Sequence, residues 1–111
     1  MVILDTNILI DHLRREPEEA LLVSIFKKYK VANLSISLVT VQELFAGASS
    51  RQQEDQILTL VSSLTVWPYT HNVAKFAGEL ERDLSRNIDF VDAAIAATAV
   101  LNESQLATLN K

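Results

Sequence analysis

The sequence contains no cysteine, and only two glycines and two prolines occur among its 111 residues. The absence of cysteine excludes a disulfide framework and a thiolate metal site, and it fits a reducing compartment. Because glycine and proline mark turns and breaks, their scarcity predicts long regular elements joined by short turns. Hydrophobic residues make up 49% of the chain, which is enough for an apolar core. We therefore expect one ordered domain over residues 1–111.

The sequence also lacks any apolar run near the roughly 18 residues that a membrane span needs. Its first residues, Met-Val-Ile-Leu-Asp, contain neither a basic region nor a cleavage site, so no signal peptide is indicated. We expect a cytoplasmic protein without membrane contact. The formal net charge is −4, which argues against a passive nucleic-acid-binding module. If the substrate is RNA, bound cations or local Arg and Lys side chains must neutralise its phosphates.

Short apolar runs alternate with helical patterns along the chain. Strands are predicted at residues 2–4, 31–37 and 105–109, with a brief extended piece at 66–69 that Pro68 restricts to an edge or a bend. Helices are predicted at residues 8–13, 17–30, 40–48, 50–64, 73–84 and 88–101. Strands that alternate with helices predict an α/β fold: a three-layer α-β-α sandwich around a mostly parallel sheet.

Polar residues follow three of the predicted strands. Asp5 follows the first strand, Glu43 lies one turn into the helix after the second, and Asn110 follows the last. In a parallel sheet of this kind, ligands bind beyond the carboxyl ends of the strands. The sequence therefore predicts a polar site at that edge of the sheet.

Each acidic residue also has a simpler structural explanation. Asp5 could form an Asx-turn or cap a helix. Glu43 could complete a capping box with Thr40. Asp89 could cap the last helix, with Asp92 favoured by the helix dipole in its first turn. Taken one at a time, these residues do not require a functional site.

The residues after Asp92 favour a functional interpretation. Residues 93–99 are Ala-Ala-Ile-Ala-Ala-Thr-Ala, so the helix is expected to run through the interior. A carboxylate at its start is partly desolvated and needs a partner. No basic residue of that helix supplies one, whereas a hard cation would. We therefore expect the carboxylates of Asp5, Glu43 and Asp92 to lie within about 4–8 Å of one another, the reach of a shared or paired metal site.

Four segments of the chain resemble, in order and spacing, the motifs of PIN-domain nucleases. They are residues 4–11 (LDTNILID), 41–47 (VQELFAG), 92–99 (DAAIAATA) and 106–111 (LATLNK). The resemblance spans nearly the whole chain. The compact form resembles a VapC-type toxin of a toxin–antitoxin pair. Many family members carry Asp where this chain has Asn110, and members usually continue past a position like Lys111 through a further edge strand. We expect the chain to lack that strand.

The resemblance implies an endoribonuclease that depends on magnesium or manganese. It also implies a homodimer and a cognate antitoxin whose peptide lies over the active site. The expected catalytic and metal-binding residues are Asp5, Glu43 and Asp92. The expected outer contributors are Asp89, Asn110 and Thr6, and candidate phosphate contacts are Arg14, Arg15 and Arg51.

Two other magnesium-using classes begin with an acid after a first strand. Haloacid-dehalogenase-type phosphatases require Asp-x-Asp, whereas this chain has Asp5-Thr6-Asn7. Receiver domains require a phospho-accepting Asp after a middle strand, whereas here that strand ends in Ser37. A catalytically silent, protein-binding PIN-like module stays open as a further alternative, and phosphoryl transfer is less favoured.

Overall fold

The computed structural model describes residues 1–14, 21–84 and 88–107. Within these residues four short strands form one parallel sheet in the order β3-β2-β1-β4. The strands are β1 (Val2–Leu4), β2 (Leu34–Ser37), β3 (Thr65–Trp67) and β4 (Gln105–Ala107). The helices are α1 (Thr6–Arg14), α2 (Leu21–Lys28), the short 3-10 helix η2 (Val31–Asn33), α3 (Leu38–Ala46), α4 (Arg51–Ser62), α5 (His71–Asp83) and α6 (Phe90–Leu101). No helix in the described ranges is long and apolar enough to cross a membrane.

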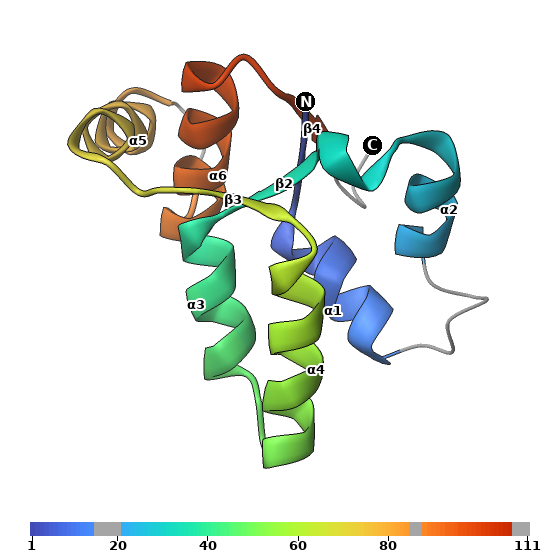
Figure 1. Ribbon diagram of the computed structural model, residues 1–111. Helices are drawn as coiled ribbons and strands as arrows, with labels where there is room; N and C mark the ends of the chain where they lie inside the picture. The colour runs from blue at the N-terminus through green and yellow to red at the C-terminus, as the bar shows by residue number, and fades with distance from the viewer. Residues whose placement is uncertain (15–20, 85–87, 108–111) are drawn as a thin grey trace.

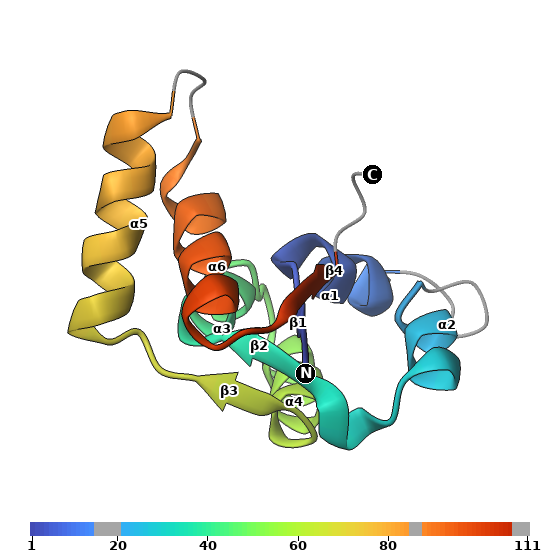
Figure 2. The ribbon, with the colours of Figure 1, turned by 90° about the horizontal axis from the view of Figure 1, so that it is seen from above.

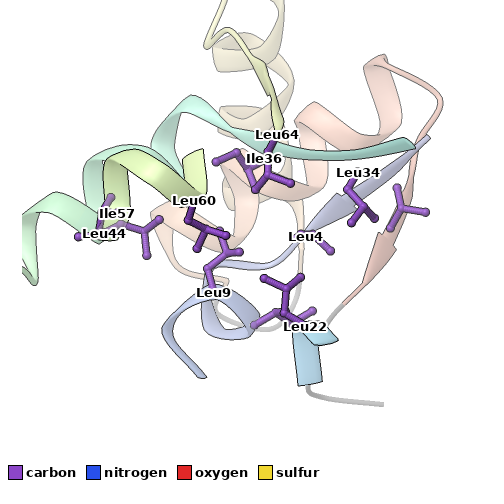
Figure 3. Close-up of a cluster of buried hydrophobic side chains, with 11 residues drawn as sticks. Leu4, Leu9, Leu22, Leu34, Ile36, Leu44, Ile57, Leu60 and Leu64 are labelled. Atoms are coloured by element: carbon purple, nitrogen blue, oxygen red, sulfur yellow. The ribbon is translucent and has the colours of Figure 1, made fainter. Parts of the chain in front are cut away.

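Helices cover both faces of the sheet, with α6 on one side and α1, α2 and α4 on the other, and α5 packs against α6 (Figures 1 and 2). Successive strand residues point to opposite faces, so Ile3 packs against Ile95 and Ala99 of α6. Leu4 points to the other face and joins the larger core (Figure 3). That core contains Val2, Leu4, Ile8, Leu9, Leu22, Leu34, Ile36, Leu44, Ile57, Leu60 and Leu64. The predicted three-layer α-β-α architecture is confirmed.

The strand register brings the carboxyl ends of the strands to a single edge of the sheet. Ile3 of β1 pairs with Ser35 of β2 and with Leu106 of β4. The amide of Asp5 extends the ladder by donating to the carbonyl of Ala107 at 2.9 Å. Helices α1 and α3 both begin directly at this edge, because each follows its strand within two residues.

The start of α3 differs from the sequence prediction, which placed it at Thr40. The helix begins at Leu38, because the Ser37 hydroxyl caps it by accepting a hydrogen bond from the amide of Val39 at 3.1 Å. Leu38, expected as an apolar strand residue, is therefore the first helical residue and is 47% exposed. Glu43 lies in the second turn of α3, so the capping box that we considered with Thr40 does not form.

Other boundaries follow the sequence more closely. Ser50 caps α4 by accepting from the amide of Gln53, and α3 ends at Gly47, both as expected. Residues 31–33, expected in a strand, form η2, where the amide of Asn33 donates to the carbonyl of Lys30. Val31 and Ala32 are exposed and have no strand beside them, so nothing favours the extended form there. The helix start predicted at Pro17 lies outside the described residues.

Candidate active site

Asp5 is held at the junction of β1 and α1, at the carboxyl edge of the sheet. Its amide belongs to the sheet ladder, and its carbonyl accepts the first helical hydrogen bond from the amide of Ile8 at 3.0 Å. The residue is half-buried, and it stands between fully buried Leu4 and buried Thr6. Its position is therefore fixed by backbone on both sides.

Asp89 and Asp92 lie together at the start of α6. Asp89 is the N-cap, and its Oδ1 accepts a hydrogen bond from the amide of Asp92 at 2.8 Å. Behind them, Ala93, Ala94 and Ala97 are completely buried, so α6 packs closely on its neighbours. Close packing by small residues brings the start of α6 down onto the sheet edge, where it lies next to the start of α3 (Figure 1).

The carboxyl group of Asp92 is electrostatically disfavoured as an anion. Its pKa lies above the ordinary value, first because the group is partly desolvated, and then because of the negative charges of Asp89 and Asp5. The influence of Asp5 indicates that the end of β1 lies near the start of α6. Neighbouring carboxylates repel one another, and a bound cation would reduce that repulsion.

Glu43 occupies a different part of the same edge. It is exposed on α3 and lines a cleft of about 270 Å³ between α1, α3 and α4. The apolar walls of this cleft come from Ile10, Leu13, Leu44 and Ile57, and Arg14 also lines it. Glu43 thus faces a groove between the three helices, and Asp5, Asp89 and Asp92 do not line it.

The structure does not by itself gather all the predicted acids into one metal-binding group. Among the residues that it describes, no three His, Asp or Glu side chains are placed to hold a metal ion. The expected close approach of Glu43 to Asp5 and Asp92 therefore stays a prediction. Asn110 and Arg15 lie outside the described ranges. Arg51 is the exposed first residue of α4.

A buried hydroxyl pair connects the helices that follow the first two strands. Thr6 Oγ1 and Thr40 Oγ1 are 2.9 Å apart, and either can be the donor. Thr6 was expected near the site, but Thr40 was considered only as a helix cap. The sequence gives one hint of this contact. Thr40 stands between Val39 and Val41, and a threonine that points inward there needs a hydrogen-bond partner.

Comparisons with known proteins agree with this geometry. The model of the PIN domain family matches residues 2–111 of the chain. The chain belongs to the PIN domain family. Among curated PIN-domain relatives, Ribonuclease VapC19 of Mycobacterium tuberculosis is 37% identical over 114 residues, which cover 99% of this chain and 89% of that protein.

Solved structures show the same PIN-domain architecture. A toxin–antitoxin complex from Klebsiella pneumoniae contains a chain with a TM-score of 0.79 and 26% identity, covering 96% of this chain and 83% of that one. The VapBC2 complex of Rickettsia felis, bound to a DNA fragment from its promoter, gives a TM-score of 0.81 over 99% of this chain and 88% of that one. Its identity is 24%, so this likeness concerns the fold alone.

Proposed function

We propose that this PIN-domain protein is a divalent-metal-dependent endoribonuclease and the toxin of a toxin–antitoxin pair. The observation that carries the proposal is the electrostatic coupling of Asp92 to Asp5 and Asp89 at the carboxyl edge of the sheet. The relatives named as VapC ribonucleases support the choice of RNA as substrate. Phosphoryl transfer and a silent binding module are the alternatives, and the family match favours the nuclease.

The donor set fits magnesium or manganese. Carboxylate oxygens are the ligands that these hard cations prefer, and the pKa of Asp92 is raised by desolvation and then by the negative charges of Asp89 and Asp5. We assign Asp5 and Asp92 as direct ligands and Glu43 as a ligand or as the group that orients the attacking water. When bound there, the metal would acidify that water and relieve charge on the phosphodiester oxygens.

The remaining residues support this arrangement. Asp89 holds the start of α6 through the amide of Asp92 and adds negative charge beside it. Thr6 fixes the first turn of α1 directly after Asp5. Arg14 lines the cleft beside Glu43 and is exposed, so it can meet a phosphate of an RNA strand lying there. Asn110 follows β4 in the sequence and is proposed as an outer contributor.

The cleft between α1, α3 and α4 is the proposed docking place for an antitoxin segment. Its apolar walls suit the apolar side of a peptide, and Glu43 suits a basic side chain reaching toward the acidic edge. A peptide seated there would cover Glu43 and Arg14. The related toxin–antitoxin complex from Klebsiella pneumoniae supports this partner. We further propose a cytoplasmic homodimer that does not act at a membrane.

Cleavage of a structured RNA by the purified protein tests the activity. Wild type should cleave in magnesium or manganese, and excess chelator should stop the reaction. Asp5→Asn should lower kcat by about a hundredfold or more, the usual effect of removing one group that stabilises the transition state. The shape of the side chain is kept, so the loss reports its charge.

Glu81→Gln is the matched control, because Glu81 is an exposed acid on α5. It should cleave like wild type. If wild type does not cleave with either metal, or if Asp5→Asn cleaves as fast as Glu81→Gln, the nuclease assignment is wrong for this protein.

A further inference from the structure

Thr6 and Thr40 are buried polar residues that bond to each other across two helices. Thr40 is completely buried and Thr6 is 5% exposed, so water cannot replace either partner. Their hydroxyl oxygens are 2.9 Å apart, although the residues are 34 positions apart in the sequence. A buried hydroxyl without a partner is costly, so each threonine requires the other.

The position of this pair relates it to the acidic edge. Thr6 directly follows Asp5, and it begins α1. Thr40 lies in the first turn of α3, one turn before Glu43. The hydroxyl contact therefore links two positions near proposed metal ligands. Thr6 is next to Asp5, and Thr40 is one helical turn before Glu43. The paired strands β1 and β2 bring the two helix starts near each other, and the hydroxyl contact lies just beyond the last residues of both strands.

We infer that the Thr6–Thr40 pair is a positioning device that sets the separation of Asp5 and Glu43. This inference rests on the proposed function and deepens it. Two oxygens in a hydrogen bond approach to 2.9 Å, whereas two methyl groups in contact need about 3.5–4.0 Å. An apolar pair of the same shape would therefore hold α1 and α3 up to about 1 Å further apart, a misplacement that can slow an enzyme about a hundredfold.

The double variant Thr6→Val/Thr40→Val separates a positioning role from a structural one. Each single valine leaves an unpaired buried hydroxyl and should lower Tm by roughly 5–15 °C. The double variant removes both hydroxyls and should regain most of that loss. If the pair only stabilises the fold, kcat should recover with Tm. If the pair positions the acids, kcat should stay about a hundredfold low while KM for RNA stays within about twofold, because neither side chain reaches the surface.

Two further variants serve as controls. Thr98→Val removes another fully buried hydroxyl, which bonds to the carbonyl of Ala94 inside α6 and does not connect two helices. It should leave kcat near the wild-type value. Thr6→Ser/Thr40→Ser keeps both hydroxyl groups and should also keep kcat.

A second readout does not depend on cleavage. Magnesium or manganese should raise the Tm of wild type, and the rise should be at least halved in Thr6→Val/Thr40→Val and kept in Thr98→Val. Wild-type kcat and an unchanged metal response in the double valine variant would overturn the inference. If that variant does not fold, Thr6→Ala/Thr40→Ala removes both hydroxyl groups and gives the same test with smaller side chains. If wild type does not cleave RNA but its Tm rises with metal, only the nuclease assignment is wrong. If wild type shows neither cleavage nor a Tm increase, the nuclease assignment and the positioning inference are both wrong.

Discussion

At the scale of single residues, Asp92 shows how position gives an ordinary side chain unusual chemistry. Its side chain is exposed on one side, yet partial desolvation and two neighbouring acids raise its pKa. The hydrogen bond that the Asp92 amide donates to the Asp89 carboxylate caps α6, and it also holds the two charged side chains near each other. A functional group and a capping residue therefore share one turn of helix, which explains why neither interpretation could be chosen from the sequence alone.

Replacing Asp92 by asparagine should leave the metal-free protein as stable as wild type or more stable at neutral pH. The substitution removes one of three mutually repelling charges, and solvent screening limits the gain to about 1 kcal/mol at most. It should also remove most of the Tm increase that magnesium gives to wild type. Thermal melts of both proteins with and without magnesium measure both effects. The opposite outcome is a lower Tm for Asp92→Asn with and without magnesium, together with a wild-type Tm that magnesium does not change. That result would indicate that Asp92 only interacts favourably with the helix dipole.

The raised pKa of Asp92 also predicts a pH dependence of stability. The folded protein binds this proton more tightly than the unfolded chain, in which the pKa of the group is near its ordinary value of 3.8. The stabilising contribution is therefore complete below that value and is lost as pH rises through the folded pKa. In metal-free buffer, the unfolding free energy of wild type relative to Asp92→Asn should fall as pH rises across this range. Urea melts at several pH values measure the difference, and a rising or constant difference would contradict the prediction.

At the scale of elements, the helix starts decide where the acids lie. The Ser37 cap begins α3 at Leu38, and the Asp89 cap begins α6 at Phe90. The first was not recognised in the sequence, because a possible capping box of Thr40 with Glu43 placed the helix start two residues later. The second was recognised, because Asp89 precedes a long apolar run. Local side-chain capping thus determines the position of Glu43 and Asp92 more directly than helix propensity does.

The parts of the fold that the sequence predicted well are those with strong periodicity or composition. The parallel sheet, the edge position near Pro68 and the apolar α6 all follow from such patterns. The Thr6–Thr40 contact could not be found in this way, because it depends on two helices meeting in space. The cleft beside Glu43 likewise arises only when α1, α3 and α4 pack together.

Two substitutions separate the contribution of Asp89 as a helix cap from the contribution of its negative charge. Asp89→Ala removes the acceptor for the amide of Asp92 and should lower the unfolding free energy by about 1 kcal/mol. Asp89→Asn keeps an acceptor and should be nearly as stable as wild type, while it removes one negative charge from beside Asp92. In Asp89→Asn, the pKa of Asp92 should fall toward its ordinary value. An NMR titration of the Asp92 carboxyl carbon measures this change. Equal stability of the two variants would exclude the cap as a stabilising contact.

At the scale of the whole molecule, some large apolar side chains remain on the surface of the single chain. The apolar residues Val23, Ile25 and Phe26, close together in the sequence, predict association with another chain, but Ile25 and Phe26 pack against the larger core. Val100 and Leu101, at the end of α6, are instead 59% and 46% exposed. Adjacent exposed apolar residues at the end of an otherwise buried helix are typical of a contact with another chain, and the proposed homodimer would cover them.

A charge placed at the end of α6 should therefore weaken the dimer. Val100→Glu would bury an unpaired carboxylate in the interface and should raise the dimer dissociation constant at least tenfold, an effect of about 1.4 kcal/mol or more. Leu58→Glu is the matched control, because Leu58 is 56% exposed on α4, away from α6. Sedimentation velocity over a range of concentrations distinguishes the cases. The interface at α6 is supported if only Val100→Glu shifts toward monomer. Equal behaviour of the two variants would place the contact elsewhere, and a wild type that stays monomeric at the highest concentration would rule out the homodimer.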